Sequence, residues 1–199
     1  MEILRSYKKK ALRPYYKHLR AGLDREALVK MNQQIMIQLL KLPIKNRGFQ
    51  YALSYLPMTM ANEVDTASFN HYLFNYFEPP IQIAYPRTNF RTLEMQAVLP
   101  DQETRYTQKW LKLLEPDKGL VLEPTQIDLV IMPLLIFDVK GNRVGYGKGF
   151  YDRYLASCRP DVLKIGLSYL PAINRIEDVD PFDIPLDYCA TPERLYDFT

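Results

Sequence analysis

Three glycines at alternate positions stand at the centre of the most distinctive segment of the sequence. Gly145, Gly147 and Gly149 follow a turn and come directly before an amphipathic segment with helical spacing. Backbone amides between such glycines can point toward one centre without obstruction by side chains, and the start of a helix adds partial positive charge. With the charges of Arg143 and Lys148 beside it, the segment predicts a site for phosphate oxygens. The glycine spacing alone is equally compatible with a loop that only reverses the chain.

Two well-known phosphate-binding motifs do not fit this segment. A dinucleotide-binding fingerprint requires a glycine three positions after Gly147, where Phe150 stands. A Walker A loop requires Ser or Thr directly after Lys148, where Gly149 stands. A phosphate site here therefore belongs to some other class.

Further charged residues could serve the same chemistry. Lys9, Arg13 and Lys17 recur every four residues, so a helix would align them as one cationic stripe. A solvated helix face is the alternative interpretation, and it is the better one for Lys17. Asp152 follows the glycines on the first turn of the next helix, from which a carboxylate can reach a phosphate-bound Mg²⁺, whereas capping or ion pairing is the structural alternative.

The order of motifs along the chain resembles the 5-formyltetrahydrofolate cyclo-ligase family, also called 5,10-methenyltetrahydrofolate synthetase. That family has a phrase like MPGLAFD, a turn, and then R-L-G-Y-G-x-G-Y-Y-D-R-x-L; here MPLLIFD at residues 132–138 precedes RVGYGKGFYDRYL at 143–155. The other family elements occur in order from near the N-terminus to near the C-terminus. They are Lys9, Leu12 and Arg13; SYLP followed by Glu63 to Thr66; Tyr85, Pro86 and Arg87; KIGLSY at 164–169; and DIPLD at 183–187.

The resemblance implies roles for particular residues. It implies ATP phosphate contacts for Lys9 and Arg13, and a catalytic contact to the γ-phosphate for Lys148. Asp152 and Asp183 are implied as ligands of Mg²⁺, although neighbouring aspartates make a structural role for Asp183 a strong alternative. The implied ATP-binding run is Arg143, Val144, Gly145, Tyr146, Gly147, Lys148, Gly149, Phe150 and Tyr151.

The same resemblance places the folate near the first expected strand. Glu63 is implied to accept paired N–H bonds from the amino-pyrimidine edge of the pterin, and a place in the first turn of a helix is its structural alternative. Leu56 and Met58 would line this pocket. Tyr146 and Phe150 could form walls for the folate ring, although isolated aromatics are core residues about as often as ligand contacts.

The sequence departs from the family pattern at three places. Leu134 replaces the usual glycine after Met132 and Pro133, which we expect to tilt one wall of the nucleotide site without removing a charge. Phe150 replaces the first tyrosine of a pair, and the PMTMANE loop before Glu63 is slightly long.

The resemblance implies an enzyme that cyclises 5-formyltetrahydrofolate to 5,10-methenyltetrahydrofolate with release of ADP and phosphate, using Mg²⁺ with ATP. A non-catalytic nucleotide- or anion-binding module on the same scaffold is the main alternative, because a fold does not fix a function. An RNA-binding protein that uses the cationic stripe is a weaker alternative, and no RNA-binding motif supports it.

The elements that must position these residues follow an α/β pattern. Two N-terminal helices are expected, one over residues 3–20 that kinks or restarts at Pro14 and one that Asp24 caps before Pro43. Short apolar runs at 50–56, 81–85, 93–99, 128–132 and 163–167 predict strands, and helices are expected at 66–77 and 149–158. This alternation predicts a three-layer, open and mostly parallel sheet flanked by helices, with an N-terminal helical pair and ligands at the carboxyl ends of the strands.

Composition limits the remaining possibilities. The 199 residues are 47% hydrophobic, enough for one domain over 1–199 with a buried core. A net charge of +3 favours a small anionic ligand over nucleic acid, and no stretch is apolar enough for a membrane span or signal peptide. Cys158 and Cys189 have no metal-binding spacing and are interpreted as reduced thiols of a cytoplasmic protein, expected to be a monomer. Trp110 is expected only to anchor a loop.

Overall fold

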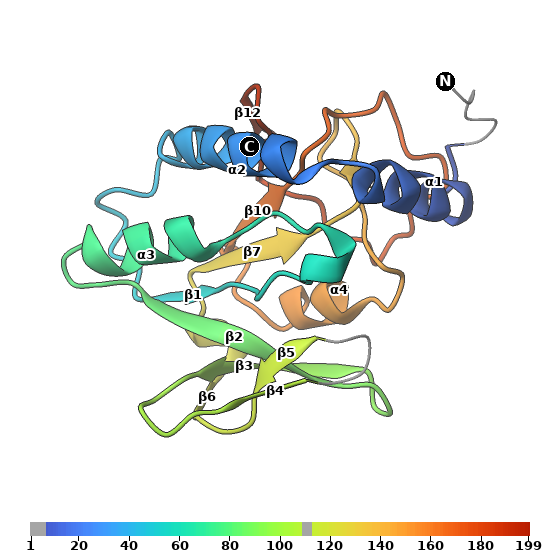
Figure 1. The fold of residues 1–199 in the computed structure, drawn as a ribbon. Helices are drawn as coiled ribbons and strands as arrows, with labels where there is room; N and C mark the ends of the chain where they lie inside the picture. The colour runs from blue at the N-terminus through green and yellow to red at the C-terminus, as the bar shows by residue number, and fades with distance from the viewer. Residues whose placement is uncertain (1–6, 109–112) are drawn as a thin grey trace.

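The computed structural model describes residues 7–108 and 113–199, and its centre is an eight-stranded sheet (Figure 1). The strand order is β12-β11-β10-β7-β1-β2-β3-β6. These strands are β1 (Tyr51–Leu53), β2 (Gln82–Asn89), β3 (Glu94–Leu99), β6 (Leu120–Leu122), β7 (Leu129–Pro133), β10 (Leu163–Leu167), β11 (Tyr188–Ala190) and β12 (Leu195–Asp197). Two separate ribbons pair β4 (Tyr106–Gln108) with β5 (Leu114–Pro116) and β8 (Ile136–Phe137) with β9 (Arg143–Val144).

The sheet is parallel at its centre and antiparallel at its edges. Strands β11, β10, β7, β1 and β2 pair in parallel, whereas β12 closes one edge and β3 and β6 the other in antiparallel fashion. The mostly parallel α/β sheet expected from the sequence is therefore confirmed. Its central strands are short and buried on both faces, as helical cover on both sides requires.

Alternate residues of β7 show how the two faces are covered. Leu129 and Ile131 pack in one core with helices α2 (Arg25–Leu39) and α3 (Ala67–Asn75). Val130 and Met132 point the other way, into a second core that includes α4 (Phe150–Leu155). Because successive side chains of a strand face opposite sides, this division gives the three layers that the sequence predicted.

Helix α1 (Lys9–Ala21) does not pack on the sheet. Its residues Leu12 and Tyr16 form a third core with Ile136 and Val144 of the β8–β9 ribbon. The two N-terminal helices are present, but they serve different cores. Helix α1 runs through Pro14 as one element, so the expected restart is wrong; Asp24 caps α2 as expected, by accepting from the amide of Ala27 at 2.8 Å.

Several element boundaries differ from expectation. The expected strand at 50–56 is shorter, since β1 ends at Leu53, and the helices at 66–77 and 149–158 contract to α3 and α4. The short strands β4, β5, β6, β8, β9, β11 and β12, and the 3₁₀ turns η1 (Thr59–Ala61) and η3 (Pro124–Gln126), were not predicted. Trp110 and the start of the expected first helix lie outside the described residues.

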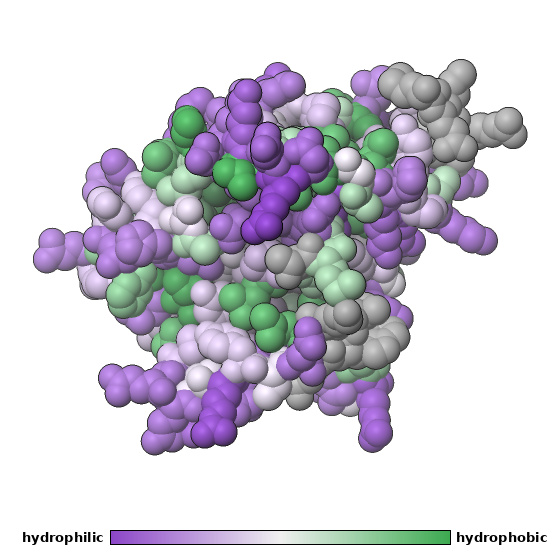
Figure 2. Space-filling view, viewed as in Figure 1, coloured by the Kyte–Doolittle hydropathy of each residue, from purple (hydrophilic) through white to green (hydrophobic). Residues whose placement is uncertain are grey.

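The face of the molecule in Figure 2 carries mainly charged and polar side chains. Figure 2 shows a face dominated by hydrophilic residues, with hydrophobic ones in small groups. Over the described ranges, every helix is too short or too polar to cross a bilayer.

Candidate functional site

A cavity of about 570 Å³ lies where the carboxyl ends of β1 and β7 meet the glycine-rich loop. Tyr55 and Leu56 follow β1 and Pro133 ends β7, and all three residues line it. Lining residues come from as far apart in the chain as Lys9 and Asp183. The cavity therefore occupies the edge of the sheet at which parallel α/β proteins usually bind ligands, and its volume suits a small molecule.

The structure brings almost all of the expected site residues to this cavity. The expected residues that line it are Lys9, Arg13, Leu56, Met58, Glu63, Arg143, Gly145, Tyr146, Gly147, Lys148, Gly149, Phe150, Tyr151, Asp152 and Asp183. Val144 is different, because its side chain is fully buried beneath α1 with Leu12 and Tyr16. Val144 holds the ribbon against α1, so any contact with a ligand must come from its backbone.

Arg13 and Arg153 lie close to two glycines of the loop. Gly147 and Gly149 have φ of +87° and +68°, a left-handed conformation that side chains disfavour. A Cβ on Gly147 would lie 3.0 Å from the guanidinium carbon of Arg13, and one on Gly149 would lie 3.0 Å from an Arg153 nitrogen. These positions therefore favour glycine for its backbone conformation, and any larger residue would also have to displace an arginine side chain slightly.

Hydrogen bonds hold the same arginines to the loop backbone. Arg13 donates to the carbonyl of Gly145 at 3.2 Å, and Arg153 donates to that of Lys148 at 2.5 Å. The carbonyl oxygens of Gly145 and Lys148 are thus occupied by arginine side chains. Because α4 has only six residues, loop amides and side-chain charges must supply most of the attraction for an anion, rather than the helix dipole.

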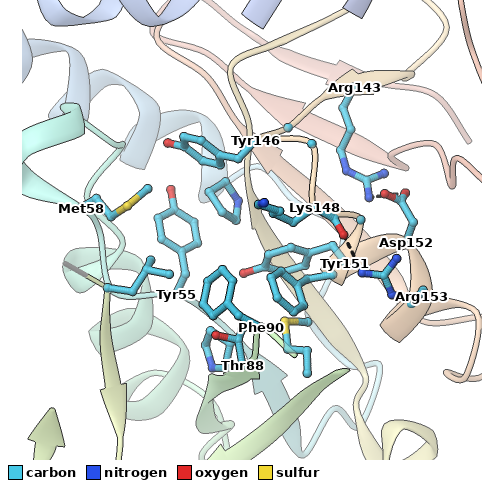
Figure 3. Close-up of a pocket in the computed structure, with 18 of the residues that line it drawn as sticks. Tyr55, Met58, Thr88, Phe90, Arg143, Tyr146, Lys148, Tyr151, Asp152 and Arg153 are labelled. Atoms are coloured by element: carbon cyan, nitrogen blue, oxygen red, sulfur yellow. Dashed lines mark hydrogen bonds and ion pairs between the residues drawn. The ribbon is translucent and has the colours of Figure 1, made fainter. Parts of the chain in front are cut away.

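Lys148 connects the two ends of the cavity. Figure 3 shows its side chain extending from the loop toward the middle of the site, between the rings of Tyr146 and Tyr151. Arg143, Asp152 and Arg153 lie beyond its backbone on one side, whereas Tyr55 and Met58 lie on the other (Figure 3). Its ammonium group is therefore placed between a charged end and an aromatic end.

Both expected metal ligands are paired with cations. Asp152 accepts from Arg143 at 2.6 Å and from the amide of Ile184 at 3.2 Å. Asp183 forms an ion pair with Lys9 and accepts from the amide of Asp180 at 2.6 Å. The described residues contain no group of three or more His, Cys, Asp or Glu side chains that could hold a metal unaided. The two carboxylates line the same cavity, and they fit Mg²⁺, which usually binds one or two carboxylates together with phosphates and water.

Glu63 is held at the aromatic end of the cavity. It is only 7% exposed, and one carboxylate oxygen accepts from the amide of Met58 at 2.7 Å while the other accepts from the hydroxyl of Tyr146. Burial raises the pKa of Glu63, and these two donors and the charge of Arg20 oppose the rise. The site thus contains a preformed acceptor pair facing an apolar space.

Sequence reasoning missed several residues of the aromatic end. Phe90 stands edge-on to Phe150, with ring centroids 5.1 Å apart. Glu115 is a second buried carboxylate, which accepts from the backbone amide and hydroxyl of Thr88 at 3.1 and 2.5 Å. These residues come from β2, β5 and the turn after β2, where no motif marked them. Arg153 was visible in the quoted motif but had been given no role.

The substitution at Leu134 has a different consequence from the one expected. Its side chain is 3% exposed and packs in the sheet core, where a Cβ on Gly166 would lie 2.7 Å from it. Leu134 is absent from the cavity lining. The expectation that it tilts a ligand wall is therefore wrong, because Gly166 of the KIGLSY segment leaves room for it in the interior.

The cavity offers cations and the glycine-rich loop at one end and buried carboxylates among aromatic rings at the other. The cations that line it are Lys9, Arg13, Arg143, Lys148 and Arg153. Such a site suits an anionic phosphate group beside a planar ring with N–H donors.

Comparison with known proteins points to one family. A model described as the 5-formyltetrahydrofolate cyclo-ligase family matches residues 5–192. A probable 5-formyltetrahydrofolate cyclo-ligase of Schizosaccharomyces pombe is 31% identical over 117 residues, which cover 52% of this chain and 57% of that protein. The 5-formyltetrahydrofolate cyclo-ligase of Escherichia coli K12 is 34% identical over 91 residues, covering 44% of this chain and 50% of that protein. The chain thus matches about half the length of these curated relatives.

Solved structures match over more of the chain. The 5,10-methenyltetrahydrofolate synthetase of Aquifex aeolicus superposes with a TM-score of 0.76 and 26% identity, covering 96% of this chain and 92% of that one. That of Mycoplasma pneumoniae gives a TM-score of 0.70 and 26% identity, covering 96% and 99%. The α/β architecture is therefore shared across almost the full length of each structure.

Proposed function

Because the chain belongs to the 5-formyltetrahydrofolate cyclo-ligase family, we propose that it cyclises 5-formyltetrahydrofolate to 5,10-methenyltetrahydrofolate while ATP is converted to ADP and phosphate. The observation that carries the proposal is the single cavity in which the glycine-rich loop meets Glu63. Loop amides and cations suit the terminal phosphates of ATP, and the Glu63 carboxylate suits the amino-pyrimidine edge of the folate.

The proposed reaction has two steps. The formyl oxygen attacks the γ-phosphorus, so that an O–P bond forms while the bond to ADP breaks. The second nitrogen of the folate, N10, then attacks the activated carbon and gives up its proton to the departing phosphate. The C–O bond breaks to release that phosphate and leave the methenyl bridge. No covalent nucleophile is required, since holding two substrates in line is worth up to about 7 to 11 kcal/mol in favourable systems.

We assign the chain's residues to parts of this reaction. Lys148 contacts the transferring phosphoryl group, whose spreading charge a positioned cation stabilises. Arg13 and Lys9 hold the phosphates from the α1 side. Glu63 orients the pterin, and the apolar walls beside Phe90 exclude water from the activated carbon.

We propose that Asp152 and Asp183 hold Mg²⁺ once nucleotide enters the cavity. When bound there, Mg²⁺ would neutralise part of the charge of the phosphates. Both carboxylates pair with candidate phosphate-binding residues, Arg143 and Lys9. Nucleotide entry would therefore exchange partners, with the cations turning to phosphate and the carboxylates to the metal.

We further propose that residues 1–199 act as one domain, as a monomer in the cytoplasm, with no nucleic-acid or membrane partner. A site assembled from Lys9 to Asp183 supports one functional unit. The unpaired Cys158 and Cys189 fit a reducing compartment.

The absorbance band of 5,10-methenyltetrahydrofolate provides the test. Purified full-length chain with 5-formyltetrahydrofolate, ATP and Mg²⁺ should generate the band, and omission of ATP should abolish it. Absence of the band at high protein concentration, with nucleotide binding intact, would instead support a non-catalytic nucleotide-binding module.

A further inference from the structure

Arg20 is a buried cation that the proposed reaction does not yet use. It lies in the last turn of α1 and is 7% exposed. Its guanidinium donates to the carbonyl of Leu134 at 3.1 Å and to the hydroxyl of Tyr146 at 2.5 Å, while its Nε has no partner. A buried charge that lacks a direct carboxylate partner is costly, and an apolar residue would serve packing better. Its presence therefore calls for another explanation.

Hydrogen bonds through the Tyr146 hydroxyl connect Arg20 to Glu63 at the aromatic end of the cavity. A tyrosine hydroxyl carries one proton and can also accept hydrogen bonds. Because Arg20 donates to this oxygen, the hydroxyl proton is directed to Glu63, with which Tyr146 forms a hydrogen bond. The amide of Met58 occupies the other Glu63 oxygen at 2.7 Å. The carboxylate is thus fixed from two sides, one of which begins at Arg20.

Arg20 is also the cation that acts on the charge of Glu63. The side chains that bear on Glu63 come from α1, from the segments after β1 and β10, and from the loop and helix at residues 146–151. They are Arg20, Tyr55, Tyr169, Tyr146 and Tyr151. Burial raises the pKa of each of these four tyrosines, to about 12 for Tyr169, so they stay neutral near pH 7. Among these groups, Arg20 alone supplies positive charge that favours the ionised carboxylate.

The position of Arg20 links the two ends of the site. Arg13 and Arg20 are seven residues apart on α1, two helical turns, and so lie on the same side of the helix. Arg13 contacts the loop at Gly145 and Gly147, whereas Arg20 contacts it at Tyr146. One helix therefore sets the position of the phosphate loop and of the residue that holds Glu63.

We propose that Arg20 is a positioning residue which, through Tyr146, keeps Glu63 ionised and oriented to bind the pterin ring of the substrate. This inference rests on the proposed function for the identity of the substrate. Arg20 does not touch the reacting atoms, and its effect is expected on folate binding rather than on phosphoryl transfer.

Binding of 5-formyltetrahydrofolate to the full-length chain, measured by calorimetry across pH 5 to 8, tests the proposal independently of turnover. Arg20→Met should raise the Kd at pH 7 by about 10- to 100-fold and leave the Kd of ATP within about twofold. It should also move the acidic limb of folate binding to higher pH, because Glu63 loses its nearby cation. Arg20→Lys should restore part of both effects.

Lys17→Met is a matched control, because it removes a different cation that lies over the Tyr146 ring. Lys17 Nζ lies 5.4 Å from the Tyr146 ring centroid, comparable to the 5.6 Å of the Arg20 guanidinium carbon. Lys17 is exposed, however, and the Tyr146 hydroxyl bonds to Arg20 and Glu63. Lys17→Met should leave folate affinity and its pH profile unchanged. Tyr146→Phe keeps the ring and the charge of Arg20 but removes the hydroxyl that donates to Glu63, so it should move the acidic limb in the same direction as Arg20→Met.

The outcomes separate the two proposals. Wild-type chain that does not bind 5-formyltetrahydrofolate would overturn both. Wild-type binding with an unchanged affinity and pH profile in Arg20→Met would overturn the role of Arg20 alone. If Arg20→Met fails to fold, Tyr146→Phe decides: a pH profile identical to that of the wild type would overturn the role of Arg20 through Tyr146.

Discussion

Replacement of Lys148 by alanine probes the proposed phosphoryl transfer most directly. The ammonium group of Lys148 extends from the loop to the middle of the cavity, between the phosphate end and the folate end (Figure 3). Loss of one donor to a developing negative charge costs about 2.7 to 4 kcal/mol in well-defined enzyme sites. The Lys148 side chain is exposed, so solvent screening favours the lower end of this range, about 3 kcal/mol. That loss corresponds to a fall in kcat of about 10²-fold.

The assay is steady-state formation of methenyltetrahydrofolate, with binding of both substrates measured separately. Lys148→Ala should lower kcat while the Kd of 5-formyltetrahydrofolate changes little, because Glu63 and the aromatic walls are untouched. Lys140→Ala is the matched control, since Lys140 is an exposed lysine of the preceding turn that does not line the cavity. A kcat for Lys148→Ala within about twofold of the control would refute the assigned role.

Three further predictions address other parts of the site. Because burial raises the pKa of Glu63 above its ordinary 4.5, folate affinity should fall as the pH is lowered from neutral toward 5. Calorimetry should show that Glu63→Gln binds folate weakly at every pH and lacks the pH dependence that Glu63 causes. An equal pH dependence in both proteins would contradict this prediction. Since Asp152 and Asp183 are ion-paired, Mg²⁺ alone should bind with a Kd weaker than about 1 mM, and it should bind more tightly when ATP is present. Micromolar binding of Mg²⁺ without nucleotide would disprove the proposal that the carboxylates exchange their cation partners for the metal when nucleotide enters. Asp138 is 1% exposed and accepts hydrogen bonds from three backbone amides at 3.0 Å. Asp138→Ala should therefore lower the free energy of unfolding, measured with urea, by about 3 kcal/mol or more. Asp161→Ala, at an exposed site, is the control, and an equally small loss in both variants would show that the three amides find other partners.

The sequence predicted the parts of the structure that depend on local patterns. Apolar runs located β1, β7 and β10, because strands covered on both faces need continuous hydrophobicity. Apolar residues also located β2 and β3, which are only partly buried. The strands that escaped prediction have two or three residues, too few for periodicity to register. The pairing of α1 with the β8–β9 ribbon depends on contacts between segments more than a hundred residues apart, which helical spacing alone does not contain.

The site shows the same division between local and long-range information. Gly147 and Lys148 could be identified because glycines and charges at fixed spacing limit what a loop does. Arg20 has no such local signal, because its role depends on contacts with Leu134 and Tyr146, more than a hundred residues away in the chain. Glu115 lies in a ribbon that meets the cavity only in the folded protein, so its two hydrogen bonds to Thr88 had no sequence signal.

The central claim is that ATP phosphates and folate meet at the glycine-rich loop. A structure of the full-length chain with a non-hydrolysable ATP analogue, Mg²⁺ and 5-formyltetrahydrofolate measures this directly. We expect the terminal phosphate within hydrogen-bond distance of amides in residues 145–149 and of the Lys148 ammonium, with the pterin on Glu63. A nucleotide bound elsewhere, with the loop unchanged and no ligand in the cavity, would contradict it.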